Sequence, residues 1–288
     1  MAKILDGKKL NEKIAKELSK KIASFDIKPK LVIIQVGNVA ESNAYIGRKV
    51  KFGEEIGAVV VHQKFEENAD QLNIVEYLDT VNSDPKVHGV IIQMPLPKHL
   101  NRDELIDHIN PKKYVDGLTS VNIKKLWENK KDAIIPATTK GILTILEEYR
   151  IPISRQKVVI VGRSSLVGKP TLIAFLNNDA TVTVCHKATR KLAAHTRDAD
   201  ILIIATGKPN LIGKEHVVEG QVVIDVGINA LELPETSDQR PGRRLVGDVN
   251  FPEVAGIVAA ITPVPGGVGP MTVASLFQNL LQSYQNQK

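Results

Sequence analysis

Three polar side chains suited to proton transfer share one face of a predicted helix. In "ESNAYIGRKVKFGEEIG", Ser42, Tyr45 and Lys49 stand at i, i+3 and i+7, so a hydroxyl, a phenol and an amine lie in line. A lysine can act as a general acid or base when burial or a neighbouring cation lowers its pKa, and a tyrosine can orient or relay the proton. The same spacing also occurs on solvated helix faces and around packed tyrosines.

Two further polar residues of the first half follow strand or turn signals. "GVIIQMPLP" ends an apolar strand with Gln93, and ligand crevices of α/β proteins open at the carboxyl ends of parallel strands. "YVDGLTSVN" places Asp116 before a glycine, where a carboxylate could bind a ring N–H. The alternatives are a glutamine bonded to its own turn and an aspartate in an Asx-type turn.

The second half contains a possible phosphate-binding turn. The strand "KVVIVG" runs into "RSSLVGKP", an arrangement that presents backbone N–H groups and a helix N-terminus to a phosphate. Gly162 allows a tight turn and Gly168 allows close approach of the helix. Ser164 stands where the usual G-x-G-x-x-G has its second glycine, and a plain turn of a parallel sheet would need no more than this.

The next strand favours NADP over NAD. An NAD site usually has an acid near the end of this strand to accept from the ribose 2′-OH, whereas "TVTVCHKATR" ends in Cys185, His186 and Lys187. Together with Arg163, the lysine favours a 2′-phosphate. The alternative is that Arg163 and Lys187 are solvated loop cations.

Two series of alternating elements must position these residues. Short apolar runs that alternate with amphipathic segments predict βαβ units and mainly parallel sheets, hence an α/β fold. The predicted strands span residues 30–36, 58–63, 89–94, 157–162, 181–185, 200–206 and 221–227, and the predicted helices of the first half span residues 41–56, 70–81 and 102–109. A connecting helix over residues 139–150 separates the two series.

Two other segments have distinctive composition. "ITPVPGGVGPMT", residues 261–272, has three prolines, three glycines and no charge, which predicts a stiff loop rather than helix or central strand. The apolar period of the following "TVASLFQNLLQSYQ" predicts a helix. "NALELPETSDQRPGRRL", residues 229–245, is polar and turn-rich, and we expect a surface loop.

Composition narrows the function classes. The net charge is +6, but the lysines are scattered among acids, so we expect small anionic ligands and no nucleic acid. The one cysteine, Cys185, excludes an internal disulfide and predicts a buried, inert thiol. The histidines have no metal-ligand spacing, so we expect no metal. No apolar run reaches the roughly 18 residues of a membrane span, and no signal peptide is evident, which predicts a cytoplasmic protein.

Taken in order, the motifs of the whole chain resemble those of the bifunctional methylenetetrahydrofolate dehydrogenase/cyclohydrolases of one-carbon metabolism. The pattern is carried by "SNAYIGRK", "GVIIQMPLP", "VDG", "VVIVGRSSLVGKP", "TVTVCHKAT", "ADILIIATGKP", "VVIDVGIN", "LVGDVNF" and "TPVPGGVGPMT". The last of these is the most specific.

The resemblance implies two α/β domains flanking a cleft, the C-terminal one Rossmann-like with a parallel sheet. Residues 1–138 would form the folate-binding catalytic domain, residues 139–270 the NADP-binding domain, and residues 271–288 a helix that returns to the first domain. The implied reactions are the NADP-dependent oxidation of 5,10-methylenetetrahydrofolate and the hydrolysis of the methenyl product to 10-formyltetrahydrofolate. The implied assembly is a homodimer.

The resemblance also assigns site residues. Lys49 would be the catalytic lysine, assisted by Tyr45, Gln93 and Asp116. Substrate would be bound by Ser42, Tyr45, Gln93, Leu96, Asp116, Pro265 and Gly266. NADP would be bound by Gly162, Arg163, Ser164, Gly168, His186, Lys187, Thr206, Gly207, Ile228 and Thr272. The Pro/Gly loop would bring uncharged backbone close to the nicotinamide and the folate.

The chain departs from the family pattern at several positions. Lys187 stands where a serine is usual, and the other departures surround the loop that supports Asp116: Tyr114 for an Asp, Lys124 in "NIKKL", and Ala137 and Thr139 in "PATT". Two alternatives therefore stay open. One is a dehydrogenase of the same family with weak or absent cyclohydrolase activity, and the other is a non-catalytic nucleotide-binding protein.

Overall fold

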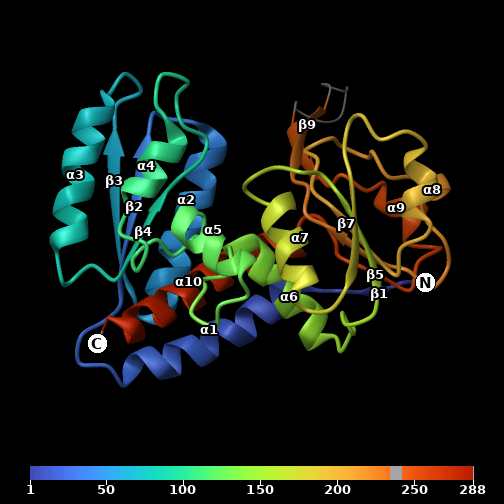
Figure 1. Cartoon of the computed structure of the whole chain (residues 1–288), viewed down its shortest axis with the longest axis horizontal. Coiled ribbons are helices and arrows are strands. Elements are labelled where there is room, and N and C mark those ends of the chain that lie inside the picture. Colours follow the sequence, from blue (N-terminus) through green and yellow to red (C-terminus); the bar gives the residue numbers. More distant parts are fainter. Residues whose placement is uncertain (234–241, 288) are drawn as a thin grey trace. The chain divides into compact units, whose positions relative to one another are not determined.

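The computed structural model describes residues 1–233 and 242–287, which form two compact units (Figure 1). The three-stranded unit comprises Asn11–Ala137 and the chain from Val273 onward, and the six-stranded unit comprises Met1–Leu10 and Thr138–Thr272. Three helices have residues in both units: α1 (Gly7–Ala23), α6 (Ala137–Glu148) and α10 (Val268–Asn286). No helix of the described chain is long and apolar enough to cross a membrane.

The three-stranded unit is built on a parallel sheet in the order β3-β2-β4 (Figure 1). Its strands are β2 (Lys30–Val36), β3 (Val59–Phe65) and β4 (Gly89–Ile92). One face packs on α3 (Gln71–Ser83) and α4 (Arg102–His108), whose Ile74, Leu78 and Leu105 are fully buried against Val32 and Ile34 of β2. Because side chains alternate along a strand, this pattern leaves the other face for different elements.

Helices α2 (Ala40–Ile56) and α10 pack near β3 in this unit. A Cβ added to Gly53 of α2 would lie 2.3 Å from a methyl of Val60 and 3.1 Å from the ring of Phe277. After α4 the chain returns to the sheet through a parallel bridge between Val90 and Tyr114, and α5 (Ser120–Trp127) follows. This bridge brings the segment that carries Asp116 beside β4.

The six-stranded unit has an all-parallel sheet in the order β1-β11-β8-β7-β5-β6. The strands are β1 (Lys3–Ile4), β5 (Lys157–Val161), β6 (Thr181–Cys185), β7 (Ile201–Ile204), β8 (Val222–Asp225) and β11 (Ala260–Ile261). The chain passes from β5 to β6 on one side and then to β7 on the other. In a doubly wound sheet, such a reversal opens a crevice at the carboxyl ends of the strands.

Short helices connect these strands. They are α7 (Gly168–Leu176), α8 (Leu192–Thr196), α9 (Phe251–Val254) and the 3₁₀ turn η1 (Lys214–His216). Cys185 is free, buried and part of the hydrophobic core of this unit, and burial raises the pKa of its thiol.

The predicted α/β class is confirmed, and each predicted strand is present within a few residues of its expected bounds. Strands β1 and β11 have no counterpart among the predictions. Each has two residues, too few for an alternating pattern, and the residues of β1 pair with those of β11 through the tertiary fold.

Two loop predictions were wrong in part. Helix α10 begins at Val268, so the Pro/Gly loop spans only residues 262–267. Pro270 is tolerated in the first helical turn because the N–H groups there have no partner within the helix. Residues 229–245 contain an antiparallel ribbon of β9 (Asn229–Leu233) and β10 (Gly242–Val246), while residues 234–241 lie outside the described chain. A ribbon paired through its backbone needs no strong hydrophobic alternation.

Candidate active site and nucleotide pocket

Lys49 and Gln93 meet at the carboxyl end of β4. The Nζ atom of Lys49, on α2, donates a hydrogen bond of 2.9 Å to Oε1 of Gln93. The Nε2 atom of Gln93 donates to the carbonyl of Met94 at 2.8 Å. Since the amide nitrogen is engaged there, the amide oxygen is turned toward the lysine.

The other two residues of the predicted helix face differ in their surroundings. Ser42 is buried, and its hydroxyl donates to the same Met94 carbonyl at 3.2 Å, so its described contact supports the Gln93 turn. Tyr45 is half-buried, with the guanidinium of Arg48 4.9 Å from its ring centroid. Burial raises the pKa of the Tyr45 phenol and the Arg48 cation opposes this, so the phenol remains a hydrogen-bond donor at neutral pH.

Asp116 acts electrostatically on Lys49. Burial lowers the pKa of the Lys49 amine, and the charge of Asp116 opposes that change. Burial raises the pKa of Asp116, opposed by the Lys49 charge and by the backbone N–H of Ala137, which donates to the carboxylate. A shift of this kind makes the neutral amine easier to reach than in an exposed lysine, as a general base requires.

Leu96 lies in the turn that follows Gln93. It is half-buried and packs against the core of the three-stranded unit. It also lines a hollow of about 890 Å³ at the carboxyl ends of the three strands, together with Gly37, Glu66, Pro95 and His99. The residue therefore lies where a ligand of this sheet would be expected.

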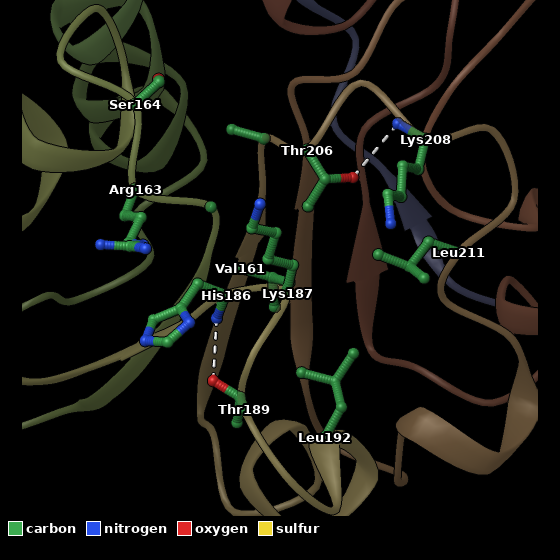
Figure 2. Close-up of a pocket in the computed structure, with 12 residues that line it drawn as sticks. Val161, Arg163, Ser164, His186, Lys187, Thr189, Leu192, Thr206, Lys208 and Leu211 are labelled. Atoms are coloured by element: carbon green, nitrogen blue, oxygen red, sulfur yellow. Dashed lines mark hydrogen bonds between the residues drawn. The ribbon is translucent and has the colours of Figure 1, made fainter.

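A second pocket, of about 440 Å³, lies at the carboxyl ends of β5, β6 and β7 in the six-stranded unit (Figure 2). Six of the predicted cofactor residues line it: Gly162, Arg163, Ser164, His186, Lys187 and Thr206. The other four predicted residues, Gly168, Gly207, Ile228 and Thr272, belong to the same unit but do not line this pocket.

Two glycines shape the turn at the end of β5. Gly162 has a φ of 128°, and a Cβ on it would lie 2.2 Å from the carbonyl oxygen of Ala205. A Cβ on Gly168, the first residue of α7, would lie 2.3 Å from the carbonyl oxygen of Gly162. The hydroxyl of Ser164 accepts from the N–H groups of Val167 (3.1 Å) and Gly168 (3.4 Å), so this serine closes the turn.

The pocket is positively charged. Arg163 and Lys187 are exposed cations, and none of the described residues that line the pocket is acidic. Figure 2 shows Arg163 and Ser164 on one side and Thr206 with Lys208 on the other. Lys208 was missed in the sequence, where the signal was a lysine directly after the Thr-Gly turn of "IATGKP".

Two buried carboxylates, Asp248 and Asp225, hold the turns after β7 and β8 and were also missed. Asp248 accepts from the N–H (2.6 Å) and hydroxyl (2.8 Å) of Thr206 and from the N–H of Gly207 (3.0 Å), so it holds the turn after β7. Asp225 accepts from the N–H of Asp248 at 3.0 Å, and burial raises its pKa to about 7. The signal was an acid inside each of the apolar runs "VVIDVG" and "LVGDVNF".

The remaining predicted residues surround the Pro/Gly loop. Pro265 is exposed, and the carbonyl of Gly266 accepts from the N–H of Lys8 at 2.8 Å. Ile228 lies against Gly269, and the hydroxyl of Thr272 donates to that of Thr138 at 3.4 Å. No group of three or more His, Cys, Asp or Glu side chains within residues 1–233 and 242–287 is placed to hold a metal.

Comparison with known proteins identifies the family. Residues 5–116 match the model of the tetrahydrofolate dehydrogenase/cyclohydrolase catalytic domain, and residues 136–288 match that of the NAD(P)-binding domain of the same enzymes. The bifunctional protein FolD of Ligilactobacillus salivarius is 42% identical over 285 residues, which cover 98% of this chain and 96% of the relative.

Two solved structures agree with this assignment. The bifunctional FolD methylenetetrahydrofolate dehydrogenase/cyclohydrolase of Campylobacter jejuni is 38% identical with a TM-score of 0.94, over 100% of both chains. The FolD of Trypanosoma brucei, complexed with NADP cofactor and inhibitor, is 32% identical with a TM-score of 0.93, over 99% of this chain and 98% of the other. The resemblance predicted from the sequence is confirmed, and the chain belongs to the tetrahydrofolate dehydrogenase/cyclohydrolase family.

Proposed function

We propose that the chain oxidises 5,10-methylenetetrahydrofolate to the methenyl form with NADP and hydrolyses that product to 10-formyltetrahydrofolate. Membership of the family supports both activities. The observation that carries the proposal is the lysine at the end of β4: Lys49 is bonded to Gln93, coupled to Asp116, and has a pKa lowered by burial.

The pocket of the six-stranded unit fits NADP. At Gly162 and Gly168 a Cβ would meet the carbonyl oxygens of Ala205 and Gly162, so the two glycines allow the turn after β5 to pack closely. Arg163 and Lys187 offer positive charge to a 2′-phosphate, and no acid among the described lining residues competes for it. NADP, when bound, supplies the acceptor for the hydride of the methylene carbon.

Hydrolysis of the methenyl cation is the step that needs an enzymic base. A water oxygen bonds to the methenyl carbon, one carbon–nitrogen bond breaks, the released nitrogen is protonated, and one proton is lost overall. The neutral amine of Lys49 takes a proton from the attacking water, and the resulting ammonium donates a proton to the released nitrogen. Gln93 holds the amine in place. The phenol of Tyr45 serves as a hydrogen-bond donor beside it.

Oxidation of the methylene group makes a smaller demand on side chains. The lone pair of the neighbouring folate nitrogen assists departure of the hydride, so the protein chiefly orients the reactants. We assign Asp116 to the pterin ring, Ser42 and Leu96 to the support of that site, and the uncharged backbone at Pro265 and Gly266 to close approach of the substrate. Gly207, Ile228 and Thr272 complete the proposed cofactor site.

We also propose a division of the chain into domains and an assembly state. We divide the chain by role into residues 1–138 for folate, 139–270 for NADP and 271–288 as the returning helix, and we note that Met1–Leu10 shares a compact unit with the NADP pocket. A homodimer is the assembly that the family resemblance implies, and the cytoplasm is the proposed location. Light scattering of the purified protein tests the dimer.

One assay tests the function. Purified protein is given methylenetetrahydrofolate and NADP, and reduced cofactor and methenyl-folate are followed together against a no-enzyme hydrolysis control. Reduction without methenyl accumulation supports both activities. Reduction with accumulation identifies a dehydrogenase alone, the alternative favoured by the substitutions at Tyr114 and Ala137 beside Asp116. Absence of reduction rejects the enzymatic proposal.

A further inference from the structure

The turn that carries Asp116 is packed against a second segment of the three-stranded unit. The N–H of Val115 donates to Val90 of β4 at 3.3 Å, and Gly117, with a φ of 74°, donates back to Tyr114 at 3.3 Å. A Cβ on Gly117 would lie 2.7 Å from the carbonyl oxygen of Ile134. Residues 134–137 therefore form the wall against which the turn rests.

One buried asparagine connects the residue after Asp116 to this wall. Asn122, on α5, donates from Nδ2 to the carbonyls of Gly117 (2.7 Å) and Ile134 (2.6 Å), and its Oδ1 accepts from the N–H of Ile134 (2.8 Å). The side chain is 4% exposed. Both of its amide hydrogens are used, one on each segment.

A second buried asparagine connects the residue before Asp116 to the same wall. Asn279, on α10, donates from Nδ2 to the carbonyls of Val115 and Ile135, each at 2.9 Å. It is fully buried and lies 164 residues from Val115 in the sequence. Residues 115 and 117 are thus each held by an amide, and Asp116 stands between them.

We propose that Asn122 and Asn279 are positioning residues that fix the turn carrying Asp116 against residues 134–137. An amide is suited to this role because it has two donors, and neither an alkyl group nor a carboxylate can supply them. The wall also contributes directly, since the N–H of Ala137 donates to the Asp116 carboxylate. This inference rests on the proposed function, in which Asp116 binds the pterin.

The arrangement has an electrostatic consequence for Lys49. The Asp116 charge acts against the burial that lowers the Lys49 pKa, and the amine of Lys49 donates its hydrogen bond to the uncharged Gln93. If the turn relaxes and Asp116 withdraws, the Lys49 pKa falls. A lysine that acts as a general base then reaches its active form at lower pH.

The test compares Asn122→Ala and Asn279→Ala with Ser283→Ala. Ser283 is a matched control on α10: it is buried and donates to the carbonyls of His88 and Lys112, away from the Asp116 turn. We measure the pH profile of methenyl-folate hydrolysis at saturating substrate, the tetrahydrofolate Kd, the NADP Kd and the melting temperature.

Both asparagine variants are expected to raise the tetrahydrofolate Kd about 10-fold or more, because misplacement of a binding group by about 1 Å has large effects. The acid limb of their pH profiles moves to lower pH, and the NADP Kd is unchanged. Asn279→Ser, which keeps one donor, gives an intermediate result and serves if the alanine variants fail to fold. Ser283→Ala is expected to lower the melting temperature and to leave both Kd values and the pH profile unchanged.

The outcomes separate this inference from the proposed function. Asparagine variants that lose melting temperature as Ser283→Ala does, with Kd and pH profile unchanged, overturn the positioning role. If the wild-type protein binds tetrahydrofolate but does not hydrolyse methenyl-folate, only the proposed cyclohydrolase activity is refuted. The comparison of tetrahydrofolate Kd values still decides the positioning role. A wild-type protein that binds no folate refutes both.

Discussion

Lys49 and Gln93 meet at the carboxyl end of β4, and Arg163 and Lys187 line a pocket at the carboxyl ends of β5 and β6. The two sites occupy the same place on their parallel sheets but use different chemistry. In the three-stranded unit, burial shifts the pKa of Lys49, so the lysine can exchange a proton. In the six-stranded unit, Arg163 and Lys187 are exposed, and two glycines allow the turn after β5 to pack closely against neighbouring backbone.

The difference shows that burial, rather than residue type, decides what a lysine does at a sheet edge. An exposed lysine remains charged at neutral pH and binds anions, whereas a buried one has a lowered pKa and can act as a base. Because the two sites belong to separate compact units, we expect changes in one to leave the other intact.

Lys49→Ala should lower cyclohydrolase activity by about 10²- to 10⁴-fold, the usual contribution of a general acid or base. The NADP Kd should not change, because Lys49 lies outside the nucleotide pocket. The measurements are methenyl-folate hydrolysis and NADP binding by titration calorimetry. Lys51→Ala, an exposed lysine of the same helix, is the control. Unchanged hydrolysis in Lys49→Ala would refute the assigned role.

Gly162→Ala should weaken NADP binding and leave the hydrolysis of methenyl-folate intact. The added Cβ meets the carbonyl of Ala205 at 2.2 Å in a backbone with φ of 128°, so the turn must move. Strain of about 1–3 kcal/mol corresponds to an NADP Kd raised by about 5- to 150-fold, while hydrolysis of added methenyl-folate persists. Gly256→Ala, where the Cβ meets nothing within 4 Å, is the control. Equal NADP affinity in both variants would contradict the placement of the pocket.

Lys187→Ala should weaken NADP binding by up to about 5-fold, as expected for one exposed charge on an anion, and leave NAD binding unchanged. The ratio of the two Kd values isolates the 2′-phosphate from the rest of the cofactor. Lys214→Ala, an exposed lysine outside the pocket, controls for net charge. If NAD and NADP binding weaken together, Lys187 does not bind the 2′-phosphate.

Asp116→Asn should move the acid limb of the cyclohydrolase pH profile to lower pH. The Asp116 carboxylate raises the Lys49 pKa, so its neutralisation lowers that pKa, and a general base that works as the neutral amine becomes active at lower pH. The profile is measured as kcat with saturating methenyl-folate, because the variant also weakens substrate binding. A limb that stays in place or moves to higher pH would show that Asp116 does not set the protonation of Lys49.

The sequence was sufficient for elements with a strong local pattern. Buried parallel strands such as residues 30–36 and 157–161 are continuous apolar runs, which can be recognised without knowledge of their partners. Gly162 was predicted from the tight turn that follows the strand, and Gly168 from the close approach of the next helix. The family resemblance supplied the roles of Lys49, Gln93 and Asp116, which spacing alone left open.

Only the tertiary structure brought distant groups together. Lys49 and Gln93 are 44 residues apart, and Asn279 reaches a carbonyl 164 residues away, so no local periodicity records either contact. The shifted pKa of Lys49 is likewise absent from the sequence, because desolvation depends on what the fold places around the amine. The sequence by itself determined the strands that are continuous apolar runs, the turn glycines and the family; long-range packing decided which polar groups are buried, paired and able to titrate.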